Sequence, residues 1–327
     1  MTFAITGANG FLGVHIIHHL LKQRHTVRAI TRLGSSLAEF DKVKEFYKLA
    51  PESYAMLTWH ECVLYDTEGL EEVFSGVDYI MHLAGVISYL GKDFNRLLEV
   101  NQQYTANVVN VAKDAGVKKL LYCSSIAAIA KSGTEEAIRE NAEWDDELPH
   151  SNYGYSKHLG ELELWRGMEE GLASVAINPG IILGYGDWTK GSNKLFGNAQ
   201  NGFPFYSNGI TGWVGVEDVA CVAIKLCISD IVGERYIIVS ENKSFKEVAD
   251  SMTTALDTKK PSTEIKGLFY QIAYYFVACK EFIGLGGMLS KETVKASIAV
   301  NYFDNTKVKT ALDFDFENID AVIRKSV

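Results

Sequence analysis

The chain has few prolines and few cysteines, and both shortages exclude classes of protein. Its 327 residues include only 5 prolines and no Ser/Gly/Pro-rich stretch, which excludes a collagen-like repeat and argues against a flexible linker. The 5 cysteines are odd in number, lie far apart and form no C-x-x-C pair, so a small disulfide scaffold is disfavoured. We therefore expect reduced thiols and a cytoplasmic location.

Positive charge is also scarce. The 32 Lys and Arg residues against 41 Asp and Glu give a net charge of −9, and the longest basic clusters are pairs such as Lys118-Lys119. Because such a charge repels phosphate polymers, we expect no nucleic acid partner.

No hydrophobic run is long enough to suggest a membrane span. The most apolar stretch, Leu268–Cys279, is interrupted by Gln271 and ends at Lys280. At about 1.5 Å per residue it cannot cross a bilayer, so we expect a lid or core helix, with contact to a membrane surface as the alternative. Met1–Thr6 has the pattern of a strand, and for this reason we expect no signal peptide.

What the chain does contain is apolar periodicity. With 47% apolar and 22% charged residues it can bury a large core, in about two lobes at roughly 150 residues per domain. Short β-rich runs alternate with longer helix-periodic runs, which predicts an α/β fold with a doubly wound parallel sheet. Strands are expected near 2–6, 26–31, 56–61, 78–83, 118–123 and 174–178, and helices near 11–24, 36–49, 67–75, 93–115 and 153–171.

After Pro179 the pattern becomes irregular and rich in glycine, which is typical of substrate-binding loops. Periodicity returns in 213–227 and 235–239, whose helix and strand are expected to rejoin the sheet. We predict a dinucleotide-binding domain from residues 1–179 and 213–240, and a smaller, discontinuous C-terminal lobe from 180–212 and 241–327.

A glycine-rich turn lies between the first expected strand and the first expected helix. Glycines at this place let the backbone approach a pyrophosphate, whose charge meets free N–H groups at the helix start. The alternative is a turn whose glycines serve backbone geometry alone. The residues expected to bind the cofactor here are Gly7, Asn9, Gly10, Phe11, Leu12 and Gly13.

Three histidines, His15, His18 and His19, follow on the same helix. Two of them are four residues apart, but no glutamate or third ligand accompanies them. We therefore expect a solvated helix face and no metal.

The second expected strand ends in Arg32, where NAD-binding proteins of this type place an acidic residue. A guanidinium there pairs with the 2′-phosphate of NADP, so NADP(H) is the preferred cofactor, with NAD(H) possible and an exposed loop arginine as the alternative.

Strand five ends in Ser124-Ser125, and a later helix-periodic run begins with Tyr153-x-x-x-Lys157. Residues four apart share a helix face, so Tyr153 and Lys157 can point together toward Ser125. The phenol can transfer a proton if the Lys157 ammonium stabilises its phenolate. Ser125 is the expected catalytic hydroxyl and Ser124 the competing choice; a serine-rich strand end beside a surface tyrosine is the non-functional alternative.

Together these motifs resemble the extended short-chain dehydrogenase/reductases, the NAD-dependent epimerase/dehydratase family, over nearly the whole chain. Arg32 and the stretch Tyr302–Lys307 are most similar to the dihydroflavonol 4-reductase and 3β-hydroxysteroid dehydrogenase branch. The resemblance implies a Rossmann fold and a homodimer formed through helices 93–115 and 153–171. Val63 departs from the family's adenine-binding acid, so only backbone contacts from Leu64 are expected there. The resemblance also implies cofactor contacts from Leu83, Ala84, Gly85, Asn101, Tyr153, Lys157, Pro179, Gly180, Ile181, Ile182 and Ser192.

We therefore expect an NADP(H)-dependent oxidoreductase that acts on a small carbonyl or hydroxyl substrate through Ser125, Tyr153 and Lys157. An NAD-dependent sugar-nucleotide epimerase is the alternative, weakened because Ile210–Gly212 lacks the arginine that holds a sugar nucleotide's diphosphate in such enzymes. A non-catalytic dinucleotide sensor is the second alternative. Candidates for the substrate pocket are Val86–Tyr89, Trp188, Asn193, Phe196 and Phe205.

Overall fold

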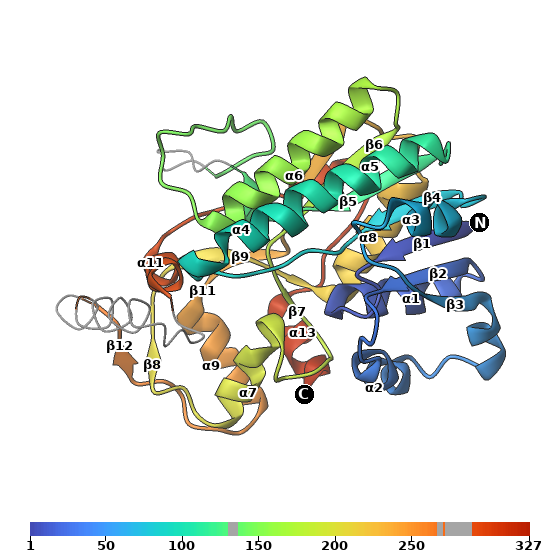
Figure 1. Ribbon diagram of the computed structural model, residues 1–327. Helices are drawn as coiled ribbons and strands as arrows, with labels where there is room; N and C mark the ends of the chain where they lie inside the picture. Colours follow the sequence, from blue (N-terminus) through green and yellow to red (C-terminus); the bar gives the residue numbers. More distant parts are fainter. Residues whose placement is uncertain (130–136, 267–270, 272–289) are drawn as a thin grey trace.

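The computed structural model describes residues 1–129, 137–266, 271 and 290–327, and it is built around a seven-stranded parallel sheet (Figure 1). The strand order is β10-β6-β5-β4-β1-β2-β3. This confirms the α/β, doubly wound class predicted from the sequence. The strands are β1 (Thr2–Thr6), β2 (Thr26–Thr31), β3 (Leu57–Glu61), β4 (Tyr79–His82), β5 (Lys119–Cys123), β6 (Ser174–Pro179) and β10 (Glu234–Ile238).

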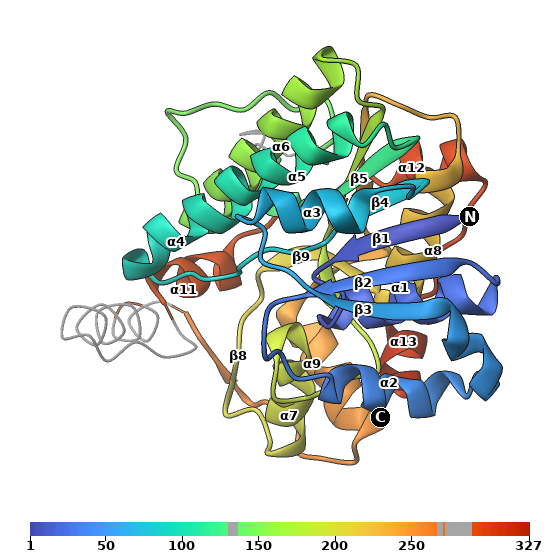
Figure 2. The same ribbon diagram turned by 45° about the vertical axis from the view of Figure 1, so that its right-hand side comes forward.

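Helices cover both faces of this sheet (Figures 1 and 2). Side chains alternate along each strand, so Phe3 and Ile5 of β1 pack in one hydrophobic cluster while Ala4 packs in the other. The first cluster lies under α1 (Phe11–Lys22), α2 (Ala38–Tyr47), α8 (Val216–Ile228) and α12 (Thr306–Leu312). The second lies under α3 (Thr67–Phe74), α5 (Tyr104–Asp114) and α6 (Asn152–Glu169).

The expected elements of the first 180 residues all form, with boundaries shifted by a few residues. The expected helix 93–115 is divided into α4 (Phe94–Leu98), a π-helical turn (Glu99–Gln103) and α5. The helix expected from residue 213 begins instead at Val216, because the residues before it belong to a strand.

A second lobe is built on a three-stranded sheet of β7 (Ile181–Leu183), β9 (Ile210–Gly215) and β11 (Glu241–Ser244). The predicted domain boundary at residue 213 therefore falls inside β9. A third hydrophobic cluster, centred on the fully buried Trp213, joins this sheet to its helices. The other elements are α7 (Lys194–Gln200), β8 (Phe205–Tyr206), α9 (Phe245–Ala255), β12 (Thr263–Glu264), α11 (Lys291–Ile298) and α13 (Ile319–Ser326).

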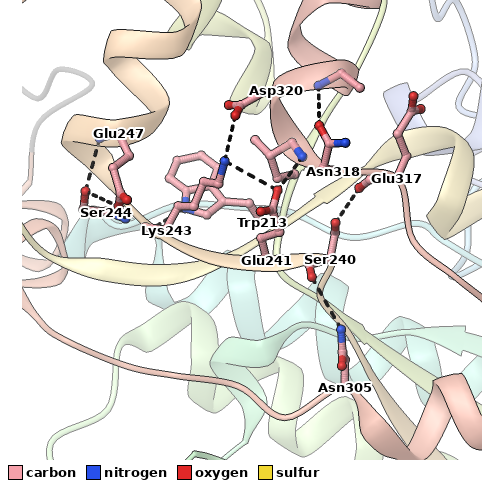
Figure 3. Close-up of polar contacts among 12 residues, drawn as sticks. Trp213, Ser240, Glu241, Lys243, Ser244, Glu247, Asn305, Glu317, Asn318 and Asp320 are labelled. Carbon is pink, nitrogen blue, oxygen red and sulfur yellow. Dashed lines mark hydrogen bonds and ion pairs between the residues drawn. The ribbon is translucent and has the colours of Figure 1, made fainter.

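Polar contacts of β11 fasten the C-terminal segment to this lobe (Figure 3). The Lys243 Nζ lies 3.5 Å from Glu241 Oε2 and 3.2 Å from Asp320 Oδ2. Glu241 also accepts a hydrogen bond from the Ile319 backbone N–H at 2.6 Å, and the Trp213 indole donates to the Lys243 carbonyl at 2.9 Å. The start of α13 is thus held by charge and hydrogen bonds as well as by apolar packing.

No helix among the described residues has the length and hydropathy needed to cross a membrane. Apart from Gln271, the expected lid or core helix Leu268–Cys279 lies outside the described residues.

The substitution Trp213→Phe tests the packing of the second lobe. It removes the indole hydrogen bond and leaves a gap in the fully buried cluster, so we expect the free energy of unfolding to fall by about 1–3 kcal/mol in urea denaturation. The control Trp144→Phe removes a surface hydrogen bond to Asp146 and keeps an aromatic ring beside His150 and His158, and it should cost less than about 1 kcal/mol. Equal losses in the two variants would contradict this account.

Candidate active site

The candidate site residues lie along one edge of the large sheet, where the parallel strands end. β1 lies between β2 and β4, so the connections after β1 and β4 leave toward opposite faces of the sheet. Ligands of open α/β sheets bind in the crevice at such a point, outside the carboxyl ends of the strands. The turn after β1, Arg32 after β2, Leu83–Gly85 after β4, Ser124-Ser125 after β5 and Gly180 after β6 all lie at this edge.

The turn after β1 is packed so closely that only glycine fits at two positions. Gly7 has φ +69°, and a Cβ atom there would lie 2.8 Å from the backbone of Ala84. A Cβ atom on Gly13 would lie 2.5 Å from the Gly7 carbonyl oxygen. The turn leads directly into α1, whose first N–H groups have no partner within the helix. These features fit the pyrophosphate of a dinucleotide.

Asn9 and Arg32 occupy the outer part of this region. The Asn9 side chain donates to the Ser36 carbonyl at 3.2 Å and so ties the turn to the loop after β2. Arg32 is exposed directly after β2, and within the described residues its guanidinium has no recorded partner. Leu64 is buried in the second hydrophobic cluster, and its carbonyl oxygen accepts a hydrogen bond from Asn107 at 3.0 Å.

The loop after β4 is held by buried hydrogen bonds. Thr6 contacts the His82 ring at 2.6 Å, and the opposite ring nitrogen contacts Thr105 at 3.0 Å. Burial lowers the pKa of His82 to about 3, so the ring is neutral. The Thr6 hydroxyl also accepts the Ala84 N–H at 3.3 Å, which joins β1 to the loop Leu83–Gly85.

Asn101 is fully buried and uses its amide to hold backbone. Its Oδ1 accepts the Val86 N–H at 2.8 Å, and its Nδ2 donates to the Val86 carbonyl at 2.9 Å and to the Ser156 hydroxyl at 3.0 Å. This expected cofactor contact therefore joins the loop after β4 to helix α6.

Lys157 is buried beside the end of β5. Its Nζ donates to the Cys123 carbonyl at 2.7 Å and lies 4.1 Å from the centre of the Tyr122 ring. Burial lowers the pKa of its ammonium to about 8, while the charges of Cys123 and Glu161 act in the opposite direction. At neutral pH Lys157 is therefore charged.

Tyr153 lies one turn earlier on the same helix and is also buried. Burial raises the pKa of its phenol above the usual value, and a hydrogen bond with Ser125 lowers it. The Tyr153 ring meets Tyr89 edge to face, with centroids 5.8 Å apart. The structure thus brings together Ser125 and Tyr153, and the phenol is protonated at neutral pH.

The two serines at the end of β5 differ in their surroundings. Ser125 is half-buried, and its hydroxyl also accepts the Ala127 N–H at 3.1 Å. Ser124 is buried, and its hydroxyl has no recorded partner among the described residues. Of these two serines, Ser125 is the one whose hydrogen bond acts on the pKa of Tyr153.

The segment after β6 crosses from the large sheet to the second lobe. Gly180 is pressed against the Gly212 carbonyl, which a Cβ atom would approach to 2.4 Å. Ile181 and Ile182, which follow the buried Pro179, are partly exposed in β7, and the Ser192 hydroxyl donates to the Ile182 carbonyl. This places Ser192 beside the segment that the resemblance assigns to the cofactor.

Two of the expected pocket residues are buried. Phe196 is fully buried in the core of the second lobe, where it stacks on Trp188, and Asn193 is 2% exposed. Among the pocket candidates, Tyr89 contacts the ring of Tyr153. Sequence periodicity could not separate these residues, because the strands and helices of the lobe are short.

The expectation of a solvated face for the histidines of α1 is wrong. His15 and His18 are fully buried, because α2 covers this part of α1 with aromatic rings. His18 stacks on Tyr47 at 4.9 Å, and His15 contacts the Tyr47 hydroxyl at 2.8 Å. Burial lowers the pKa of His15 to about 3. Within the described residues no group of three His, Cys, Asp or Glu side chains could hold a metal ion.

Comparison with known proteins identifies the family. The model of the NAD dependent epimerase/dehydratase family matches residues 3–226, more than half of the chain. The chain belongs to this family. The resemblance to the extended short-chain dehydrogenase/reductases is confirmed, and with it an NAD(P)-dependent enzyme of the oxidoreductase type.

Named relatives of the chain include reductases. A protein of Synechocystis sp. that is provisionally named dihydroflavonol 4-reductase is 25% identical over 335 residues, 99% of this chain and 93% of the relative. Cinnamoyl-CoA reductase 1 of Petunia hybrida is 27% identical over 252 residues, 71% of each chain. A solved structure of UDP-glucose 4-epimerase from Bifidobacterium longum, in complex with NAD+ and UDP, has a TM-score of 0.77 at 18% identity and covers 100% of this chain and 97% of the epimerase. At that identity the likeness concerns the fold.

The substitution Gly13→Ala tests the turn after β1. Its new methyl group would lie within 3 Å of the Gly7 and Ala8 carbonyl oxygens, so the turn must move, and we expect affinity for NADPH to fall at least about tenfold in a fluorescence titration. The control Gly91→Ala adds the same methyl group where no atom lies within 4 Å. A Gly13→Ala variant that binds NADPH as the control does would contradict the close packing.

Proposed function

We propose that the protein is an NADP(H)-dependent carbonyl reductase or alcohol dehydrogenase, similar to the dihydroflavonol reductases, with Ser125, Tyr153 and Lys157 as its catalytic residues. The observation that carries this proposal is the position of Tyr153 one helical turn before the buried Lys157, whose ammonium is bound at the end of the strand that leads to Ser125. The reductase names among the relatives support it.

In this proposal each side chain has a separate task. The bound dinucleotide supplies a hydride for the substrate carbonyl carbon. Ser125 donates a hydrogen bond to the carbonyl oxygen, where negative charge develops. Tyr153 donates its proton to the same oxygen, for which its high pKa and protonated state are suited. Lys157, one turn further along the same helix, would stabilise the phenolate that remains through its positive charge.

The residues would contact the cofactor at three places: the pyrophosphate, the nicotinamide ribose and the 2′-phosphate. The turn from Gly7 to Gly13 would hold the pyrophosphate, and Lys157 would contact the nicotinamide ribose. Arg32 supports NADP(H) over NAD(H), because an exposed guanidinium without a recorded partner within the described residues is available for the 2′-phosphate. NAD(H) remains the alternative cofactor.

A sugar-nucleotide epimerase is the second candidate, favoured by the fold that the chain shares with UDP-glucose 4-epimerase. An epimerase regenerates its NAD in every turnover. NAD retained through purification, with no net consumption of cofactor and with activity on a nucleotide sugar, would support it over the reductase.

We further propose a homodimer formed through α5 and α6, on which Leu162 is 48% exposed. The four described cysteines are free thiols, which supports a reducing compartment and hence a cytoplasmic location.

The substitution Tyr153→Phe tests the reductase directly. Because the proton donor is lost, we expect kcat for NADPH consumption with aldehydes and cyclic ketones to fall at least about a hundredfold. Tyr155→Phe is the matched control on the same helix, since Tyr155 lies instead against Phe94 and Trp144. Equal activity of the two variants would sink the assignment.

The substitution Arg32→Ala tests cofactor choice. Loss of a charge-assisted bond to the 2′-phosphate should weaken NADPH binding about tenfold to a hundredfold and leave NADH binding nearly unchanged, as measured by fluorescence titration. Arg324→Ala, which removes another exposed arginine from α13, is the control. An equal loss for both cofactors would contradict a role in 2′-phosphate recognition.

A further inference from the structure

A buried polar network lies beneath the catalytic helix α6. Glu161 follows Tyr153 and Lys157 by two turns and one turn, and its side chain is 1% exposed. Its Oε1 accepts a hydrogen bond from Asn178 Nδ2 of β6 at 2.6 Å, and its Oε2 lies 3.1 Å from Arg235 Nη1 of β10. A carboxylate this deeply buried needs such partners to remain charged.

Asn178 connects this carboxylate to the reacting end of β5. The same Nδ2 that meets Glu161 also donates to the Ser125 carbonyl oxygen at 3.0 Å. Asn178 is itself fully buried, so these two bonds determine which way its amide faces. A continuous path therefore leads from Glu161 through Asn178 to the backbone of Ser125.

Arg235 determines where the Glu161 carboxylate lies. Besides its contact with Glu161, it donates to the Glu140 carbonyl at 2.7 Å and to the Ala142 carbonyl at 3.0 Å. With its guanidinium held at three points, Arg235 leaves the carboxylate little freedom to turn away.

The same carboxylate acts on Lys157. The titratable groups recorded around Lys157 are Tyr122 and Cys123 from β5, His82 from β4 and Glu161 from its own helix, and Tyr153 lies one turn earlier on that helix. His82, with a pKa of about 3, is neutral at pH 7, and the Cys123 thiol, with a pKa raised to about 11 by burial, is neutral as well. Tyr122 and Tyr153 are protonated because burial raises both pKa values. Glu161, which forms an ion pair with Arg235 one helical turn from Lys157, is thus the carboxylate of this set.

We propose that Glu161 is a positioning residue of the catalytic site, which orients Ser125 through Asn178 and supplies the negative charge that keeps the buried Lys157 an ammonium. Its part in catalysis rests on the reductase function proposed above, whereas its effect on Lys157 does not. Without this carboxylate, the effect of burial on Lys157 would meet less opposition, and the ammonium would lose its proton at a lower pH.

The decisive experiment measures the Lys157 titration in the protein without cofactor or substrate. Lysine labelled with 13C at Cε reports this titration by NMR, and Lys157→Arg assigns the signal. In Glu161→Gln we expect the Lys157 midpoint to fall by about 0.5–1.5 pH units, because one nearby charge is lost. An unchanged midpoint would overturn the proposal.

Two further variants make this result specific. Glu163→Gln removes a carboxylate from the same helix that pairs instead with Arg166 at 2.9 Å, and it should leave the Lys157 midpoint in place. If Glu161→Gln does not fold, Arg235→Gln replaces it. The carboxylate then loses its cationic partner, so the Lys157 midpoint should rise, and a fall would count against the proposal.

The link to Ser125 is tested with Asn178→Ala, which keeps the Glu161 charge but breaks the path. We expect kcat for carbonyl reduction to fall about tenfold, with the KM for NADPH and the Lys157 midpoint unchanged. A kcat equal to that of the unaltered protein would overturn this link. An unaltered protein that reduces no carbonyl would contradict the proposed function, while the NMR titration would still decide the effect of Glu161 on Lys157.

Discussion

The site depends on one close approach of backbone to backbone at the edge of the large sheet. Gly7 lies against the loop after β4 and beneath Gly13, with no room for a Cβ atom at either glycine. This contact brings the start of α1 next to the end of β4. The positive end of a helix dipole is therefore exposed at the point where the connections leave in opposite directions.

A second constraint is the burial of polar groups around α6. Helix α6 can pack tightly on the sheet only if every charged or hydrogen-bonding group on its inner face finds a partner. Lys157 meets the Cys123 carbonyl, Glu161 meets Arg235 and Asn178, and Ser156 meets Asn101. The same bonds that satisfy the helix fix the positions of Lys157 and Ser156 on its inner face.

Relatives with similar folds carry out different reactions, and the described residues suggest why. The turn after β1 and the inner face of α6 lie against the large sheet. The second lobe is attached through β7, β9 and β11, and through the charged contacts of Lys243 and Glu241 that hold α13. The contacts that hold this lobe are thus separate from those around the turn after β1 and the inner face of α6.

The sequence by itself determined the α/β class, the positions of the first six strands along the chain and the glycine turn. Apolar periodicity and glycine placement are local properties of the chain, so they are visible in the residues. It also indicated Ser125, Tyr153 and Lys157, since helical spacing and a strand end are visible in the residues. The tertiary structure decided the rest. The histidines of α1 are buried because α2 covers them, Phe196 lies in the core of the lobe, and Glu161 meets Asn178 and Arg235 from strands that are distant in the chain. Contacts between distant segments leave no periodic signal, so only the folded chain reveals them.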